Sequence, residues 1–153
     1  MTRRKVTCWS FVGNITSNAQ PRQDISIGMN CEYKMTAIHE MMHCTGFQHT
    51  QCRTDRDVYI TVYLENVQED MRYNFDKYTA DEIDLYGAYD LFSVMHYSCY
   101  AFSMNGRMTM SAKTDPTCRT ELGQPHVGGG FVQSDIDKLN CMYCGASNDH
   151  CPQ

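Results

Sequence analysis

The stretch His39–His49, which reads HEMMHCTGFQH, decides the fold. His39 and His43 are four residues apart, so on a helix they project from one face and can bind the same metal ion. Gly46 permits the positive φ that ends a helix sharply, and the reversed chain can then bring His49 to that ion. The spacing therefore predicts a helix that carries two metal ligands, with a third just beyond its end.

The residue types predict zinc chemistry at this helix. Three neutral imidazoles leave one position of a tetrahedral Zn²⁺ ion open, which is typical of a catalytic zinc site rather than a structural one. Glu40 follows the first histidine and is placed to reach a water on the same metal. The alternative, a surface helix with incidental histidines, requires both the pair and the offsets of Gly46 and His49 to arise by chance. We therefore expect metal-assisted hydrolysis with one Zn²⁺ per chain.

The same residues resemble a known family. Residues 39–49 match the long zinc signature of the metzincins, and Arg53–Tyr59 (RTDRDVY) is similar to the astacin family in particular. Ser93–Tyr97 (SVMHY) matches the second metzincin hallmark, the Met-turn. Further matches extend from Cys8–Ser10 to Asp135–Cys144, so the resemblance covers nearly the whole chain. The sequence is thus identified as an astacin-like zinc metalloendopeptidase domain.

This resemblance implies an α+β, zincin-like fold. The zinc helix is expected between a partial N-terminal sheet subdomain, within 1–46, and an irregular C-terminal subdomain, 47–144. Together these make the catalytic domain, 1–144, and 145–153 is expected to be a short tail. The resemblance also implies that the sequence enters the domain at its substrate-edge strand, without the domain start, signal peptide and propeptide. Thr50 departs from the family, where a glutamate at this position pairs with the mature N-terminus.

The resemblance assigns roles to individual residues. Glu40 is expected to take the proton of a zinc-bound water as it attacks a peptide carbonyl. Tyr97 is expected to be a switchable zinc ligand that stabilises the oxyanion, and Met95 to pack beneath the metal. An edge strand is expected to pair with an extended substrate, although an internal strand is the plain alternative; its residues are Cys8, Trp9, Ser10 and Phe11.

Composition narrows the function and the compartment. The 153 residues include 18 acids against 13 bases, for a net charge of −5, which argues against a nucleic-acid partner. No run of about 18 apolar residues predicts a transmembrane helix. Nine cysteines and an Asn-Ile-Thr sequon at Asn14 favour a secreted, disulfide-bonded protein. The oligomeric state is not indicated.

The cysteines are expected to form several disulfides with one left over. Cys8–Cys31 matches a family disulfide, and Cys144 matches one half of another whose upstream partner is missing. A Cys52–Cys99 bridge is predicted, because these cysteines follow the third ligand and the Met-turn. Cys141 and Cys144 form a single CxxC, which by itself is a weak zinc signal.

Hydrophobic spacing predicts the remaining elements. His96 is expected to be structural, and His126 and His150 to lie at the surface. The region 104–130 contains turn residues, including the glycines at 128–130. The predicted elements are strands at Cys8–Val12, Asp24–Met29 and Asp57–Asn66 and helices at Tyr33–Thr45 and Ser134–Asn140. For Asp57–Asn66, an extended connector is the alternative to a strand.

The leading hypothesis is therefore a secreted zinc endopeptidase that cleaves proteins or peptides. The first rival is a truncated, catalytically weak product that binds zinc or a partner. The second is a disulfide-rich toxin or matrix-binding module without enzyme function, which accounts for the cysteines but not for the histidine signature.

Overall fold

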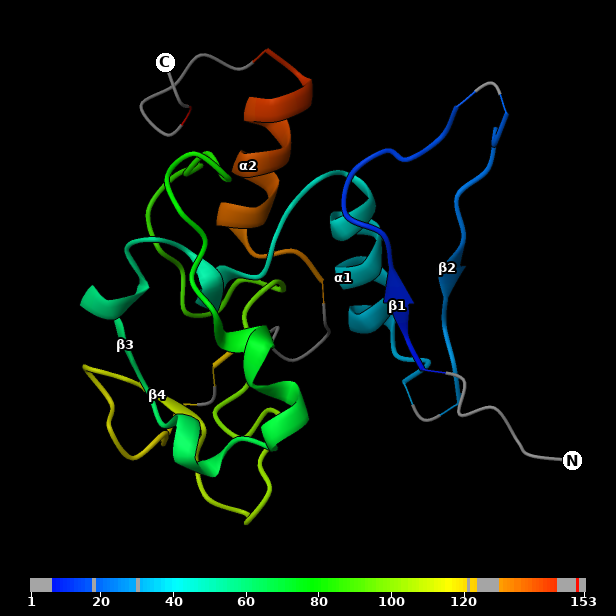
Figure 1. Cartoon of the computed structure of the whole chain (residues 1–153). Helices are drawn as coiled ribbons and strands as arrows, with labels where there is room; N and C mark the ends of the chain where they lie inside the picture. Colours follow the sequence, from blue (N-terminus) through cyan, green and yellow to red (C-terminus); the bar gives the residue numbers. More distant parts are fainter. Residues whose placement is uncertain are drawn as a thin grey trace, which may run out of the picture. The chain divides into compact units, whose positions relative to one another are not determined.

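The computed structural model describes residues 7–17, 19–29, 31–120, 122–123, 130–145 and 151. The chain divides into two compact units, Met1–Gln48 with His126–Gly130 and His49–Pro125 with Phe131–Gln153, and each is described by itself. Helices and short strands together give an α+β architecture (Figure 1). The strands and α-helices are β1 (Trp9–Ser10), β2 (Ile25–Ser26), α1 (Lys34–Cys44), β3 (Ile60–Val62), β4 (Met110–Ala112) and α2 (Gln133–Tyr143).

The first unit contains a two-stranded antiparallel sheet beside one helix. β1 and β2 pair with Trp9 opposite Ser26, and the disulfide Cys8–Cys31 closes this segment with its Cα atoms 6.1 Å apart. Ladder pairing ends after two residues, so both strands are shorter than predicted. Gly13, at φ +77°, follows the β1 segment and breaks its extended conformation.

Helix α1 runs alongside β1 (Figure 1). The Ser10 Oγ donates a hydrogen bond to the Glu40 carbonyl oxygen at 2.9 Å, and the Gly13 amide donates to the His43 carbonyl oxygen at 2.8 Å. These two bonds fix the strand against the helix. The helix itself lies where the sequence predicts it, with Tyr33 and Thr45 as its caps.

The second unit is organised around a sheet of β3 and β4, which pair antiparallel with Ile60 opposite Ala112. The predicted strand Asp57–Asn66 is reduced to Ile60–Val62, because 3₁₀ helices occupy Arg56–Val58 and Leu64–Asn66. Two further 3₁₀ helices occupy Thr50–Cys52 and Glu69–Phe75. The hydrophobic core consists of the buried residues Ile60, Val67, Phe75, Tyr89, Cys99, Met110, Ala112 and Leu122.

The predicted Cys52–Cys99 bridge is wrong. Cys99 is bonded to Cys118 instead, with Cα atoms 6.5 Å apart, and Cys52 remains a buried thiol. The reason is local. The Cys99 carbonyl accepts hydrogen bonds from the backbone at the start of β4, from the Thr109 amide at 2.8 Å and the Met110 amide at 3.3 Å. The Cys52 thiol donates to the Asn74 carbonyl oxygen at 3.2 Å.

Helix α2 begins earlier and ends later than predicted. Its N-cap is Val132, so Ser134 lies inside the first turn, and its hydroxyl donates to the Asp90 carboxylate.

Cys141 forms a disulfide with Cys151, so it is not a ligand in a CxxC zinc pair. Cys144 is an exposed thiol. His126, His150, the glycines at 128–129 and nearly all of the tail lie outside the described residues.

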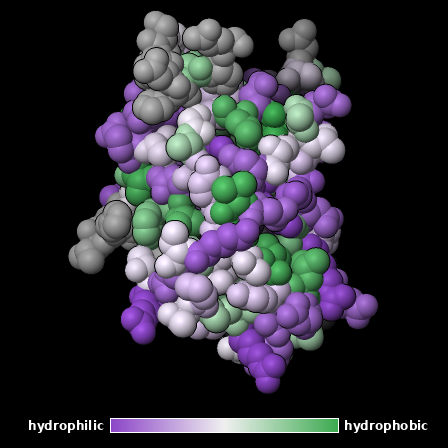
Figure 2. All heavy atoms as spheres, turned by 90° about the vertical axis from the view of Figure 1, so that its left-hand side faces the viewer, coloured by the Kyte–Doolittle hydropathy of each residue, from purple (hydrophilic) through white to green (hydrophobic). Residues whose placement is uncertain are grey.

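The surface of the described residues is mixed in polarity. On the face that Figure 2 shows, hydrophobic side chains are scattered among hydrophilic ones. Scattered apolar side chains of this kind are normal for a protein surface. Among the described helices, none is both long and apolar enough to cross a lipid bilayer.

Candidate metal centre

Helix α1 presents the first two histidines as neighbours. His39 and His43 are one turn apart, and their rings meet edge-on with centroids 4.6 Å apart. The Nδ1 of His43 lies 2.8 Å from the Phe47 carbonyl oxygen. A carbonyl oxygen only accepts, so Nδ1 carries the proton and Nε2 keeps its lone pair for a metal. Burial, followed by the charge of His39, lowers the pKa of His43 to about 4, which favours this neutral form.

The end of α1 explains how the chain turns toward the third histidine. The Gly46 amide donates to the His43 carbonyl oxygen at 2.8 Å, and the Phe47 amide donates to the Met42 carbonyl oxygen at 3.2 Å. This pair of bonds is a Schellman motif, which needs a left-handed residue after the helix cap. Gly46 supplies it with φ +98°. The reversal occupies the few residues that separate His43 from His49.

The three histidines converge. The candidate ligand nitrogens of His39, His43 and His49 all lie within 4.8 Å of one another. Around a tetrahedral zinc with Zn–N bonds of about 2.0–2.1 Å, such nitrogens lie about 3.4 Å apart. Small side-chain adjustments bring the observed set to that spacing, so three imidazoles in this arrangement fit a zinc ion with an open fourth position. The structure thus brings together all three predicted ligands.

Glu40 lies between the two helical histidines in a buried position. Its side chain and backbone are only 6% exposed, and burial raises the pKa of its carboxyl above the ordinary value, while His39 opposes that rise. A carboxyl with a raised pKa exchanges protons nearer to neutral pH than an exposed glutamate does. Its environment therefore suits a group that takes up and returns a proton.

The predicted substrate edge lies along α1 in the first unit. Cys8 is held by its disulfide to Cys31, and Ser10 is bonded to α1. Trp9 and Phe11 are both more than 40% exposed, and their rings meet edge-on with centroids 5.3 Å apart. Among the described strands, β1 pairs only with β2. One edge of β1 therefore has no strand partner within the described residues.

In the second unit, the predicted Met-turn is packed against the segment that follows His49. Met95 is 1% exposed, and its carbonyl oxygen accepts a 2.9 Å hydrogen bond from the Thr50 amide. The Gln51 side-chain oxygen accepts one from the Tyr97 amide at 3.2 Å. These bonds couple the backbone around His49 to both Met95 and Tyr97.

Tyr97 itself lies beside the third ligand. Its ring is tilted against the His49 ring, with centroids 4.5 Å apart, and Phe102 and Phe75 enclose its other sides at 5.4 and 6.0 Å. Tyr97 is half-buried rather than enclosed in the core. These ring contacts place the Tyr97 side chain next to His49.

His96 belongs to a separate buried network. Its Nδ1 lies 2.7 Å from the Tyr97 carbonyl oxygen and its Nε2 lies 2.8 Å from the Tyr89 hydroxyl. Since the carbonyl accepts, Nδ1 is the protonated nitrogen and Nε2 accepts from Tyr89. Tyr89 in turn stacks on Tyr59 at 4.6 Å and lies under the guanidinium of Arg53. His96 thus ties the Met-turn to an aromatic layer.

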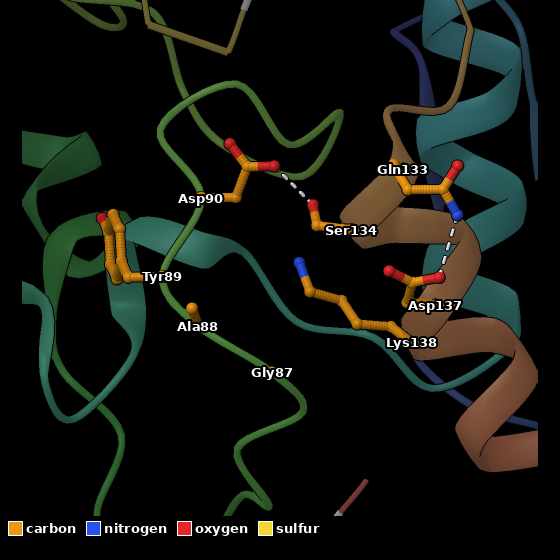
Figure 3. Close-up of a pocket in the computed structure, with 8 residues that line it drawn as sticks. All are labelled: Gly87, Ala88, Tyr89, Asp90, Gln133, Ser134, Asp137 and Lys138. Carbon is orange, nitrogen blue, oxygen red and sulfur yellow. Dashed lines mark hydrogen bonds between the residues drawn. The ribbon is translucent and has the colours of Figure 1, made fainter. Parts of the chain in front are cut away.

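A cavity of about 270 Å³ lies elsewhere in the second unit, between the segment Gly87–Asp90 and α2 (Figure 3). Hydrogen bonds from Ser134 to Asp90 and from Gln133 to Asp137 run along its wall. None of the candidate ligands or catalytic residues lines it. It is therefore distinct from the chemistry predicted at the histidines.

Sequence reasoning missed two residues that hold this site together. Gln51 is fully buried and Asp135 is fully buried, and both bind backbone atoms of the segment 93–97. Asp135 was one of the residues that carried the family resemblance, but its partners are more than 40 residues away in the chain. Gln51 adjoins the motif and carried no signal of its own. Only tertiary structure pairs them with the Met-turn.

This α+β arrangement with three converging histidines is that of a zincin-like catalytic domain. Residues 1–144 match the family model described as Astacin, a family of peptidases. The chain belongs to the astacin family. The resemblance seen in the sequence is therefore confirmed.

Individual relatives agree with this assignment. The chain is 47% identical to Protein SpAN of Strongylocentrotus purpuratus over 89% of its residues, and 38% identical to Meprin A subunit alpha of Mus musculus over 94%. These matches span only 21% and 19% of the relatives' own lengths. Among solved structures, High choriolytic enzyme 1, a hatching enzyme zinc-protease from Oryzias latipes, superimposes with a TM-score of 0.78 at 34% identity. That match covers 92% of this chain and 66% of the other.

Proposed function

We propose that this protein is a zinc-dependent metalloendopeptidase in which His39, His43 and His49 bind a single Zn²⁺ ion. The observation that carries the proposal is the convergence of the three ligand nitrogens within 4.8 Å. Membership of the astacin family supports the same chemistry. Since the chain spans about a fifth of the length of the curated relatives above, the activity of the whole protein is part of this proposal.

Bound zinc would supply a Lewis acid that makes water acidic near neutral pH and polarises a carbonyl group. Glu40 acts as the general base and then as the general acid. Its carboxylate accepts a proton from the attacking water and returns it to the departing amine. The buried position of Glu40 and its raised pKa support this role, because the same group must both accept and release a proton.

Tyr97 stabilises the charge that develops on the substrate carbonyl oxygen. Its hydroxyl donates a hydrogen bond to that oxygen in the transition state, where the negative charge is largest. The proximity of its ring to His49 supports this role. Met95 supports the site from the core by fixing the backbone beside Thr50.

The substrate is an extended protein or peptide segment that adds a strand to β1. Backbone hydrogen bonds to a strand edge give affinity that is independent of sequence, and side-chain contacts give preference. The edge without a strand partner in the described sheet supports this mode, and the exposed rings of Trp9 and Phe11 would contact substrate side chains. The Cys8–Cys31 disulfide and the bond of Ser10 to α1 hold the strand in place.

We also propose that the protein is secreted. Three disulfides join described cysteines, Cys8–Cys31, Cys99–Cys118 and Cys141–Cys151. Disulfides persist in oxidising compartments and are rare in the cytosol. Export through the secretory pathway accounts for them.

Cleavage of a quenched fluorogenic peptide tests the proposal. The protein should cleave it, a chelator should stop cleavage, and added Zn²⁺ should restore it. Glu40→Gln should bind zinc normally but lose cleavage by a factor on the order of 100 or more. Stoichiometric zinc without any cleavage in the unaltered protein would instead support a zinc-binding product without turnover.

A further inference from the structure

The carboxylate of Asp135 is buried completely and bonds to the first residues of the Met-turn. Its Oδ1 accepts a hydrogen bond from the Ser93 hydroxyl at 2.6 Å, and its Oδ2 accepts one from the Val94 amide at 2.9 Å. Asp135 lies in the first turn of α2, where the positive end of the helix dipole favours a carboxylate. The last α-helix of the described chain is thus bonded directly to the segment that carries Met95 and Tyr97.

The Ser93 hydroxyl extends this contact into the turn. It accepts a hydrogen bond from the Met95 amide at 3.2 Å while it donates to Asp135. From the other side, the segment after His49 holds Met95 and Tyr97 through Thr50 and Gln51. The Met-turn is therefore fixed at its beginning by α2, and further along by the Thr50 amide and the Gln51 side chain, which follow the third histidine.

An aspartate is the residue type that this position requires. A carboxylate is an acceptor only, so both oxygens can face the donors of Ser93 and Val94 at once. An asparagine would have to turn its NH₂ group toward either the Ser93 hydroxyl or the Val94 amide, and that group would then lose its acceptor. The only cation paired with the carboxylate among the described residues is Lys138, whose Nζ is 3.6 Å from Oδ1 and whose side chain is 9% exposed. A buried charge is costly, so its retention here calls for a function in the fold or at the site.

We propose that Asp135 is a positioning residue that holds Tyr97 in register with His49 by fixing residues 93–97. This inference rests on the function proposed for Tyr97. It differs from a purely structural role, since it requires loss of the carboxylate to act on catalysis through Tyr97 and not through general unfolding. Asp135 contacts neither substrate nor metal.

Hydrogen exchange of the metal-free protein tests whether Asp135 fixes residues 93–97, and it does not depend on enzyme activity. In Asp135→Asn, the amides of Val94 and Met95 should exchange at least about tenfold faster than in the unaltered protein, while the amides of α1 keep their protection. Asp137→Asn is the matched control, because the hydrogen bond of Asp137 to Gln133 stays within its own helix. Unchanged exchange at residues 93–97 would overturn the inference, whether or not the protein proves to be a peptidase.

A double-mutant cycle tests the catalytic step. Asp135→Asn should lower kcat on the order of 10–100-fold with KM and zinc content nearly unchanged, but by less than about twofold when Tyr97 is already phenylalanine. Equal losses in the two backgrounds would show that Asp135 does not act through Tyr97. Should Asp135→Asn fold poorly, Ser93→Ala removes one of the same hydrogen bonds and should show the same dependence on Tyr97. If the unaltered protein is inactive, only the proposed peptidase function is contradicted. The hydrogen-exchange result then shows whether Asp135 fixes the turn.

Discussion

Individual side chains at the candidate metal centre are oriented by hydrogen bonds within the protein. The Phe47 carbonyl selects the tautomer of His43, and Ser10 anchors the helix carbonyl of Glu40. Such outer contacts orient the ligands and reduce the cost of binding an ion. The residues proposed to bind zinc and the residues that orient them can therefore be tested by separate substitutions.

The third ligand is the most informative to remove. His49→Ala should leave two imidazoles, and zinc should then be lost at chelator concentrations that the unaltered protein tolerates, because each ligand adds to the binding free energy. Metal content after dialysis against a graded chelator measures this. His126→Ala, outside the predicted ligand set, serves as the control. Stoichiometric zinc in His49→Ala would refute the assignment.

The phenol of Tyr97 should act mainly in the transition state. Tyr97→Phe keeps the ring packing against His49, Phe75 and Phe102 but removes the hydroxyl. We expect kcat to fall on the order of 10–1000-fold, with KM and zinc content close to normal. Steady-state kinetics with metal analysis measure the split, and an unchanged kcat would eliminate the proposed role.

Asn14 offers a test of whether the protein is glycosylated during secretion. It lies in an exposed segment, and its Oδ1 accepts hydrogen bonds from the Thr16 amide at 2.9 Å and the Thr16 hydroxyl at 2.6 Å. A protein that passes through a eukaryotic secretory pathway should carry an N-linked glycan on the Asn14 side-chain nitrogen. Glycosidase treatment should shift its mass and convert Asn14 to Asp. Thr16→Ala should abolish the shift and Thr16→Ser should preserve it, whereas a secreted protein without glycan would contradict the expectation.

At the scale of elements, one glycine lets two backbone segments come into close contact. Gly123, at φ +63°, donates its amide to the Leu91 carbonyl oxygen at 2.9 Å and lies against the Met-turn. A Cβ built on it would lie 1.9 Å from the His96 carbonyl oxygen. No side chain fits at that distance. The Met-turn can therefore lie this close to residue 123 only because that residue is a glycine.

Two glycine substitutions separate the cost of backbone strain at positive φ from the cost of a steric clash. Gly106→Ala and Gly123→Ala both place a Cβ at positive φ, but the Cβ at Gly106 would meet nothing within 4 Å. We expect Gly106→Ala to cost about 1 kcal/mol of unfolding free energy, and Gly123→Ala to cost about 1–3 kcal/mol more. Urea unfolding measures both. Equal losses would show that the backbone at Gly123 moves freely to accommodate the new atom.

Some elements were predictable from the sequence for a physical reason. The helix at Lys34–Cys44 was predicted within one residue, because its periodicity and the glycine that ends it are both local signals. The strand β4 was missed, since Met110–Ala112 lies among turn residues and becomes a strand only by pairing with β3. The bridge at Cys99 was mispredicted for the same reason, because spacing along the chain does not reveal which loops meet in the core.

For the protein as a whole, stability should depend on pH through buried histidines. Burial lowers the pKa of His96 to about 4, below the value near 6.5 that it has when unfolded. Between these two values the unfolded chain binds the proton and the folded protein does not. Stability is therefore complete above about pH 6.5 and is lost as the pH falls toward 4, by up to about 3 kcal/mol.

Unfolding of the metal-free protein at about pH 7.5, 6 and 5 checks this sign. His96→Gln keeps a side chain able to donate and accept hydrogen bonds but cannot titrate, so its stability should vary less with pH. His43, with a pKa also lowered to about 4, acts in the same direction, so part of the slope should remain. A slope as steep in His96→Gln as in the unaltered protein would assign the effect to other groups.

For the candidate site as a whole, the sequence indicated the proposed zinc ligands. It did not indicate the residues that hold the Met-turn in place. The α+β class and the family followed from motifs that occupy short stretches of sequence. The contact of Asp135 with Ser93 joins residues 42 positions apart, and no periodicity encodes it. The roles of the ligands, Glu40, Tyr97 and the β1 edge stay predictions until they are measured.

The bond between Asp135 and the Met-turn also sets an order in time. During synthesis at about 5–20 residues per second, Asp135 is made roughly 2–8 seconds after Ser93. Until then, the turn lacks the acceptors that its hydroxyl and amide groups use in the finished protein. The histidines of α1 are made long before, so the nascent chain would acquire a means of binding zinc before it acquires a fixed tyrosine. The turn can therefore reach its final hydrogen bonding only after the start of α2 has been synthesised.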